Sequence, residues 1–246
     1  KYDYISAFQS FRTNSNGLNK KCTGTPKLAK GNDITIIDET CSFDNVSIMS
    51  SGIGQVLDDS YLESRLASKL SSAPSDNWKL VGYHFTLQSM NPGIKTTENT
   101  AKFFDLIRQH AAIGVQAHTH TAMASCPISS AFTSGSIIPK CDSSFGNDLE
   151  SRFIAPGTSV YLDSSIGGKE TRPRSQCSDP SSTDCKHMVD LITAEGYTRI
   201  DGAKKYNLPD AGAMFIVFNQ GGDPNKAFVY FKTVDGQTVF SFTITR

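Results

Sequence analysis

Apolar residues in the middle of the chain follow two periods, one typical of buried strands and one typical of helices. Lys79–Phe85 and Ile113–Ala117 are short, nearly continuous apolar runs, which is the pattern of strands buried on both faces. Residues 60–70 begin with a capping-box pattern and then show helical spacing, and residues 97–111 predict a second helix. The middle of the chain therefore alternates strand and helix, which makes its neighbouring strands parallel.

The flanking regions predict further strands of two kinds. Asp33–Asp38 and Asn45–Met49 are β-branched runs, and Ser159–Leu162 and Met214–Phe218 are further strand-length segments. Residues 227–244 alternate apolar and polar positions around an Asp-Gly turn, as an antiparallel hairpin does. The other long stretches are predicted loops: 1–31, with a short helix near Ala7–Phe11, 121–150 and 163–190.

Composition narrows the class of protein. The chain has 246 residues, 38% of them hydrophobic, with 24 basic and 24 acidic side chains. A net charge of zero argues against a basic nucleic-acid binder, and no apolar run reaches the ~20 residues of a membrane span. We expect one domain over residues 1–246 of a globular protein. Because the chain begins at Lys1 without Met or signal peptide, we also expect that something precedes it in a longer protein.

The six cysteines indicate the compartment. They fall into three sequence-local pairs, and none has the C-x-x-C spacing of a zinc or redox site. We favour three disulfides that each close a loop, although six cysteines allow 15 pairings and six reduced thiols in a cytosolic protein are the alternative. The favoured pairs are Cys22–Cys41, Cys126–Cys141 and Cys177–Cys185. With the sequon at Asn45, they predict a secreted, extracellular glycoprotein.

Three of the five histidines follow the ends of predicted parallel strands. His84 closes the first apolar run, and His118 and His120 follow the second. If the strands are parallel, these side chains meet at the carboxyl edge of the sheet, where ligands bind in such folds. In an extended segment, residues i and i+2 share a side about 6.6 Å apart, a spacing that suits ligands of adjacent metal ions or of one ion. Imidazole ligands favour Zn, Fe, Cu or Ni. The other two histidines have different interpretations: His110 is predicted to lie at a helix end, and His187 in a surface segment.

The order of these motifs resembles the carboxyl-terminal half of the calcineurin-like metallophosphoesterases, closest to the secreted purple acid phosphatases. The resemblance covers roughly residues 33–246 and rests on W-K-L-V-G-Y-H-F, G-V-Q-A-H-T-H, V-Y-L-D-S-S-I-G-G-K and the apolar tail. It implies an α/β fold bordering on α+β: a β-sandwich with flanking helices, a partly parallel sheet and a carboxyl-terminal antiparallel hairpin.

The resemblance also implies a function and a cofactor. His84 and His118 are similar to ligands of one metal, and His120 to a ligand of its neighbour, in a site of Fe, Zn or Mn ions that hydrolyses phosphate esters. The family's earlier carboxylate motifs do not precede His84 in this chain. A second metal would therefore need an amino-terminal half before Lys1, and a cleaved amino-terminal fragment becomes a possible partner.

Three functions follow from these observations. The first is an acid-phosphatase-like enzyme to which this chain contributes the histidine half of a dinuclear site. The second is a catalytically inactive extracellular protein with a structural or binding role, because the carboxylate motifs are missing. The third is a mononuclear zinc hydrolase with three histidine ligands and an open water position.

Overall fold

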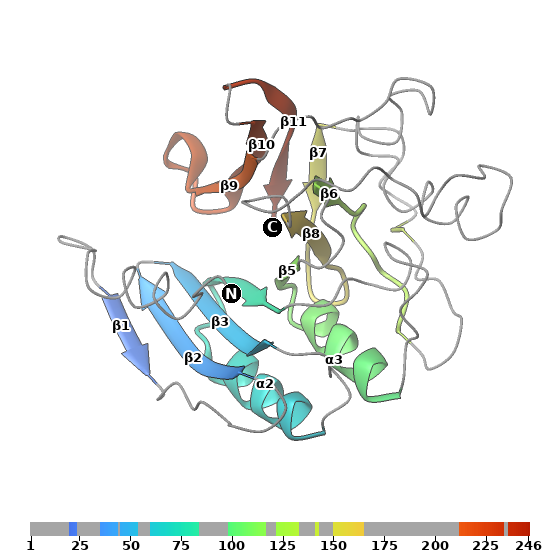
Figure 1. Ribbon diagram of the computed structural model, residues 1–246. Helices are drawn as coiled ribbons and strands as arrows, with labels where there is room; N and C mark the ends of the chain where they lie inside the picture. The colour runs from blue at the N-terminus through green and yellow to red at the C-terminus, as the bar shows by residue number, and fades with distance from the viewer. Residues whose placement is uncertain are drawn as a thin grey trace, which may run out of the picture.

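The structure is a computed structural model, and the residues that it describes form two β-sheets and two α-helices (Figure 1). It describes residues 20–23, 35–43, 45–53, 60–83, 98–116, 122–132, 141–142, 150–164, 212–233 and 236–246. The protein is thus of a mixed α/β class, as the sequence predicts.

Seven strands form the larger sheet, in the order β1-β2-β3-β4-β5-β8-β6. Their bounds are Lys20–Thr23 for β1, Thr35–Phe43 for β2, Val46–Ile53 for β3, Trp78–Gly82 for β4, Ile113–Gln116 for β5, Ala122–Ala124 for β6 and Val160–Ser164 for β8. The four central strands, β3, β4, β5 and β8, pair in parallel, and the outer pairings are antiparallel. The parallel order predicted for the two histidine-bearing strands is confirmed.

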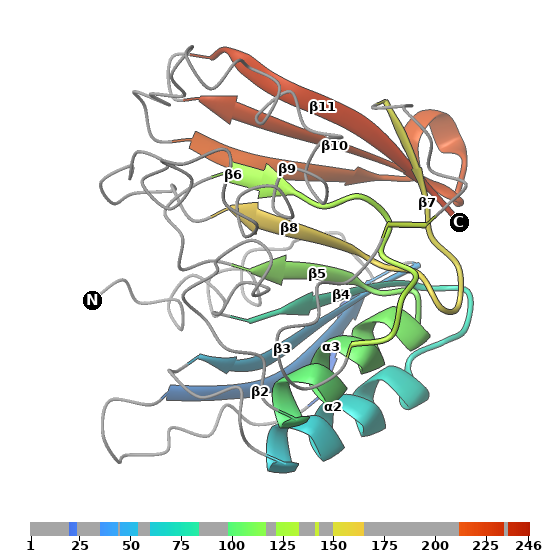
Figure 2. The ribbon, with the colours of Figure 1, turned by 90° about the vertical axis from the view of Figure 1, so that its right-hand side faces the viewer.

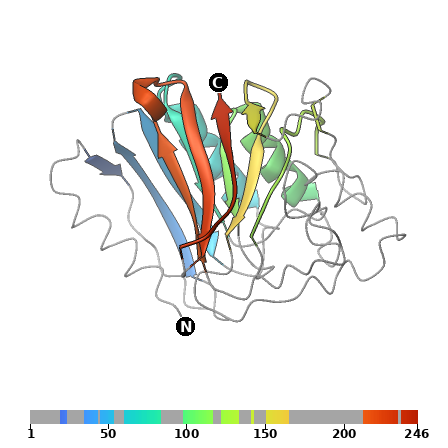
Figure 3. The same ribbon diagram turned by 90° about the horizontal axis from the view of Figure 1, so that it is seen from above.

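Two helices cover one face of the larger sheet, as Figures 2 and 3 show. They are α2, over Ser60–Ser72, and α3, over Glu98–Gln109. The buried side of α3 carries Phe103, Phe104 and Ile107, each no more than 1% exposed. The hydroxyl group of Tyr161 on β8 donates to the carbonyl of Phe104 at 2.9 Å, which ties this helix to the sheet.

Four strands form the smaller sheet, in the order β7-β11-β10-β9, on the other face of the larger sheet (Figures 2 and 3). Their bounds are Ser151–Phe153 for β7, Gly212–Phe218 for β9, Lys226–Thr233 for β10 and Thr238–Thr245 for β11. Strands β10 and β11 form the predicted antiparallel hairpin. Alternate positions of β10, such as Val229 and Phe231, are fully buried, whereas Phe215 and Val217 on β9 remain 42% and 46% exposed.

Specific side chains join the two sheets near the start of β4. The ring of Trp78 lies 5.5 Å from the ring of Phe218, and its indole N–H donates to the carbonyl of Pro224 at 2.9 Å. Nearby, the side-chain amides of Asn45 and Asn219 bond to each other in both directions, at 2.7 and 3.1 Å. Asn219 precedes the short 3₁₀ helix η2, Gln220–Gly222.

Some predicted loops contain strands. Residues 1–31 and 121–150 are predicted loops, yet β1 and β6 lie within them, and β7 begins at Ser151. β6 and β7 have only three residues each, too few for a period to be visible. The predicted helix near Ala7–Phe11 and the long 163–190 excursion, from residue 165 onward, lie outside the described residues. In the part of the chain that is described, no helix has the length and apolar character to cross a bilayer.

Candidate functional site

The carboxyl ends of β4, β5 and β8 form one edge of the larger sheet. Gly82, the last residue of β4, pairs with Val115 of β5, and Gln116, the last residue of β5, pairs with Asp163 of β8. His84 follows β4 by two residues, and the H-x-H element follows β5 directly along the chain. The three predicted metal ligands, His84, His118 and His120, themselves lie outside the described residues.

Three polar side chains are buried where these strands end. Tyr83, Gln116 and Asp163 are 6%, 2% and 0% exposed. The phenol O–H of Tyr83 donates to Oε1 of Gln116 at 2.9 Å, which joins the end of β4 to the end of β5. A buried polar group needs such partners because leaving it unpaired is costly. Tyr83 precedes His84 in the sequence, Gln116 lies two residues before His118, and Asp163 pairs with Gln116, so these residues form the described part of the candidate site.

The charge state of this group follows from its burial. Burial raises the pKa of Tyr83 well above its ordinary value, and the neighbouring Tyr161 and Asp163 raise it further. The phenol is therefore protonated at neutral pH and acts as a hydrogen-bond donor. The edge thus holds a neutral donor, an amide and a buried carboxyl side chain in adjacent strands.

Gly114 on β5 permits this packing. A Cβ atom at this position would lie 2.5 Å from Cδ1 of Tyr161 and 2.8 Å from the hydroxyl oxygen of Tyr83, both closer than real Cβ contacts. Two tyrosine rings therefore occupy the space that a side chain at Gly114 would need. The glycine allows β5 to lie between β4 and β8 without displacing the buried phenol.

Sequence reasoning did not identify Tyr83, Gln116 and Asp163 as site residues. Tyr83 and Gln116 are part of predicted apolar strands, and the predicted loop 163–190 begins at Asp163. The available signal is a polar side chain at or next to the end of an otherwise buried strand. Such a residue must find a partner on a neighbouring strand, and the parallel order identifies that neighbour.

The donor types at this edge fit a transition metal. The predicted imidazoles suit such an ion, and a buried carboxyl side chain such as that of Asp163 is of the type that often pairs with a metal-bound histidine. Within the described ranges, no group of three His, Cys, Asp or Glu side chains forms a metal site. The residues that could hold a metal at this edge are therefore the predicted histidines together with Asp163, which lies on β8, the strand next to β5.

The predicted cysteine pairs differ in how much of them the structure describes. Cys126 and Cys141 form a disulfide bond with an S–S distance of 2.05 Å, as the sequence analysis expects for this pair. Cys22 and Cys41 lie directly opposite each other in the β1–β2 register, and their pairing stays a prediction. Cys177 and Cys185 lie outside the described residues.

The sequon residue Asn45 lies in the turn before β3, with its amide engaged. Its Nδ2 atom donates to Oδ1 of Asn219 at 2.7 Å and to the carbonyl of Pro224 at 3.4 Å. Ser47 of the same sequon is buried and accepts a bond from Asn77 at 2.9 Å. A glycan on Nδ2 would leave one N–H for these contacts, and glycosylation stays a prediction.

His110 lies just after α3, before the start of β5. It is half-buried, and burial lowers its pKa, with a further lowering from the nearby Lys79. Its backbone N–H continues the helix by donating to the carbonyl of Leu106 at 3.2 Å. This agrees with its reading as a helix-end residue, while His187 lies outside the described residues.

No protein-family model matches this chain, and no curated protein is significantly similar to it in sequence. The resemblance to the metallophosphoesterases therefore rests on the motifs quoted above. The function that this resemblance implies is therefore a proposal.

Proposed function

We propose that the protein takes part in metal-dependent hydrolysis of phosphoric esters, in the manner of an acid phosphatase. His84, His118 and His120 would hold the metal at the carboxyl edge of β4 and β5. One observation carries the proposal: these strands are parallel neighbours in register, so the residues that follow them emerge at the same edge. The ions expected are Fe, Zn or Mn.

We also propose that the layers correspond to those of a metallophosphoesterase sandwich. In support, α2 and α3 cover one sheet, and the second sheet ends in an antiparallel hairpin. The partly parallel sheet agrees with what the resemblance implies. The proposed correspondence of the layers does not depend on glycosylation, disulfide bonds or secretion.

The residues of the chain divide into ligands and groups that orient them. When bound, the metal would lower the pKa of a water molecule and neutralise charge on the ester. Gln116 ends β5, and Asp163 pairs with it on β8, so in this proposal these two residues would orient the H-x-H element that follows β5 in the sequence. The protonated Tyr83 fixes the Gln116 amide by donating to its oxygen. Burial of all three side chains excludes water from beneath the site.

A second function is favoured by a specific observation in the sequence. The family's Asp-x-His, Gly-Asp and Gly-Asn-His motifs do not precede His84 in the chain. Without those carboxylates the scaffold would be an inactive extracellular structural or binding protein. A mononuclear zinc site built on three imidazoles would need no further carboxylate ligand and is the third reading.

The test is a metal analysis of the full chain together with hydrolysis of p-nitrophenyl phosphate. We expect stoichiometric Fe, Zn or Mn, and a loss of at least about 100-fold in activity for His118→Ala and His120→Ala, since even indirect partners of metal ligands cost 10–100-fold. His187→Ala serves as the matched control and should keep its activity.

The outcomes separate the three readings. Two metals with hydrolysis when an amino-terminal half is present support the dinuclear phosphatase, and one zinc with hydrolysis by the chain alone supports the mononuclear enzyme. A folded chain with neither metal nor hydrolysis contradicts both enzymes and supports the inactive scaffold.

A further inference from the structure

A cavity lies at the opposite end of the parallel strands from the candidate site. It has a volume of about 320 Å³ and is lined by the α2–β4 turn, the start of β4, the end of α3, the β7–β8 connection and Arg246. β4 begins at this cavity with Trp78 and ends before His84, and each of its residues advances the chain by about 3.3 Å. The cavity is therefore separate from the histidine edge, and nothing in the proposed function uses it.

Two permanently basic side chains line this cavity. Arg246 places its guanidinium group 4.6 Å from the centre of the Trp78 ring, and its Nη2 atom donates to the carbonyls of Asp76 and Pro224. These contacts fix the guanidinium plane, while Nε and Nη1 make no hydrogen bond to the described residues. An arginine held in this way is preorganised to bind a planar anion with its remaining N–H groups.

Lys79 supplies the second cation. It is only 9% exposed, yet its ammonium group makes no ion pair or hydrogen bond with the described part of the chain. Burial lowers the pKa of Lys79, the nearby Arg246 lowers it further, and the Asp76 carboxylate raises it. An anion bound beside Lys79 and Arg246 would act on Lys79 in the same direction as Asp76 does. His110 also lines the cavity, and Asp76 is the one acidic side chain among the lining residues.

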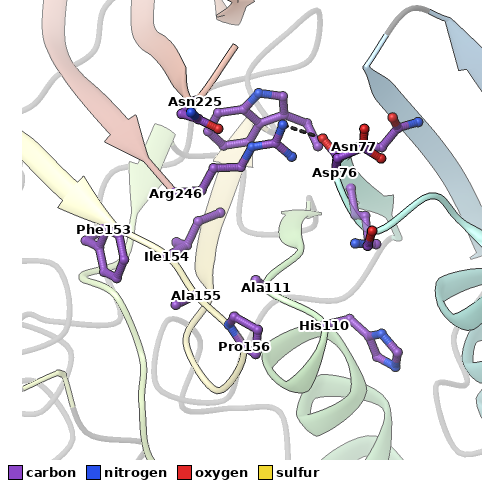
Figure 4. A pocket seen from close by; sticks show the side chains of 13 residues that line it. Asp76, Asn77, His110, Ala111, Phe153, Ile154, Ala155, Pro156, Asn225 and Arg246 are labelled. Atoms are coloured by element: carbon purple, nitrogen blue, oxygen red, sulfur yellow. Dashed lines mark hydrogen bonds between the residues drawn. The ribbon is translucent and has the colours of Figure 1, made fainter. Parts of the chain in front are cut away.

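The remaining wall is apolar. Figure 4 shows Phe153, Ile154 and Pro156 along one side of the cavity, with Arg246 above them and Asp76 and Asn77 across from them. Phe153 is 56% exposed, which is unusual for a phenylalanine and leaves its ring available to a ligand. The wall is held in place by Arg108 of α3, whose Nη1 atom donates to the carbonyl of Gly157 at 2.9 Å.

Two backbone carbonyl groups at the end of α3, those of Arg108 and Ile107, are bonded to backbone N–H groups rather than to the two cations. The carbonyl of Arg108 accepts bonds from the N–H groups of Ala111 and Gly157, both at 3.1 Å. The carbonyl of Ile107 accepts from Ala112 at 3.0 Å. These terminal carbonyls are therefore satisfied locally rather than by Lys79.

We propose that this cavity binds a small organic monoanion, with a carboxylate between Lys79 and Arg246 and a flat apolar body against the Phe153–Pro156 wall. A carboxylate matches the planar fork of an arginine. The Asp76 carboxylate at the rim disfavours a dianion, which selects against a phosphate group. A cavity of about 320 Å³ accommodates a single aromatic ring with its acid group.

Trp78 provides the measurement, because it is the single tryptophan of the chain and lies in the wall. The full chain is titrated with sodium benzoate at constant ionic strength while tryptophan fluorescence is recorded. Benzamide, which has the same shape without charge, and inorganic phosphate are titrated in parallel. We expect a saturable change with benzoate below roughly 10 mM, no change with benzamide, and binding of phosphate that is at least about tenfold weaker.

Variants locate the site. Arg246→Gln and Lys79→Gln should each weaken benzoate binding at least about tenfold, because each removes a charge-assisted contact. Phe153→Ala should weaken it a few-fold, and its exposed position makes it safe for folding if the Lys79 variant is unstable. Phe215→Ala, an exposed aromatic on the outer face of β9, is the matched control and should bind as the parent chain does.

Three results would overturn the proposal. They are the absence of a saturable signal with benzoate, an equal response to benzamide, and unchanged affinity in both Arg246→Gln and Phe153→Ala. Because none of these measurements involves metal or ester hydrolysis, their failure leaves the proposed phosphoesterase function unaffected.

Discussion

The two ends of the central parallel strands are built in different ways. At the carboxyl end, the candidate residues lie within a few residues of the ends of β4, β5 and β8 in the sequence, so a local pattern identifies each of them. At the amino end, the cavity is assembled from turns, a helix end and Arg246, which lie far apart in the sequence. The first kind of site is visible in a local pattern, and the second is visible only in the folded chain.

The two ends also differ in how their polar groups are satisfied. Tyr83 and Gln116 at the carboxyl end are buried and bonded to each other. At the amino end, Lys79 is 9% exposed as a whole residue, and its ammonium group lines the cavity near the Asp76 carboxylate. Bonded buried groups indicate a rigid framework, whereas cations that line an open cavity can still bind an anion.

The largest expected effect on stability at the carboxyl end of the strands comes from adding a side chain at Gly114. Gly114→Ala places a Cβ atom 2.5 Å from the Tyr161 ring, and we expect a loss of roughly 2–3 kcal/mol in the free energy of unfolding from overpacking. Gly82→Ala on the neighbouring strand is the control, because its Cβ atom would meet nothing closer than 3.9 Å. Chemical denaturation of both variants measures the difference, and equal stabilities would contradict the packing described.

A smaller effect tests the hydrogen bond that joins β4 to β5. Tyr83→Phe removes the donor to the buried Gln116 oxygen, and we expect a loss of about 1–2 kcal/mol. Tyr230→Phe, a half-exposed tyrosine on β10, should change stability by less than about 0.5 kcal/mol. If the two variants unfold alike in denaturant, the buried bond does not contribute as proposed.

The loop that carries the cavity wall depends on Asp105 of α3. Asp105 accepts bonds from Arg108 at 2.8 Å and from the amide of Phe132 at 3.3 Å. Burial raises the pKa of Asp105, but these bonds outweigh it, so the pKa is lowered overall. The native value then lies below the unfolded value of about 3.9, so the stabilisation is complete above that pH and is lost as the pH falls through the native pKa.

Asp105→Asn should therefore cost about 1 kcal/mol at neutral pH and reduce the loss of stability on acidification below about pH 4. The control is Glu98→Gln, which breaks an ion pair with Lys102 whose side chains are 75% and 49% exposed, and should cost less than about 0.5 kcal/mol. Denaturation at neutral and acidic pH compares the two. An unchanged acid profile in Asp105→Asn would contradict the assignment.

The smallest expected effect is on benzoate affinity at the cavity near the amino end of the strands. Asp76→Asn removes the one acidic side chain that lines the cavity, and we expect benzoate to bind about two- to threefold more tightly, as for a solvent-exposed charge. The fluorescence titration of Trp78 measures this change. Weaker binding in Asp76→Asn would place the anion somewhere other than beside Lys79 and Arg246.

Much of the central architecture could be predicted from the sequence, for a physical reason. Strands buried on both faces must be apolar throughout, and the helices between them must present an apolar side, so both leave strong periodic signals. β4, β5 and α3 were therefore placed to within a few residues. β6 and β7 were missed because three residues cannot display a period.

The two sites also differ in how much of each a local sequence pattern reveals. The histidines were singled out because they follow apolar runs, although they lie outside the described residues. The Tyr83–Gln116 bond and the pairing of Lys79 with Arg246 in one cavity depend on register and on contacts between distant segments. No local pattern carries that information, so these features required the folded structure.

The most direct test of the account asks where a metal binds. Mn²⁺ broadens nuclear magnetic resonance signals with a steep inverse dependence on distance, so titration of the full chain with Mn²⁺ ranks its residues by their distance from the ion. We predict the strongest broadening at the backbone N–H groups of Tyr83, Gln116 and Asp163, and the weakest at the indole N–H of Trp78 at the other end of β4. Strongest broadening at Trp78, or no selective broadening, would contradict a metal site at the histidine edge.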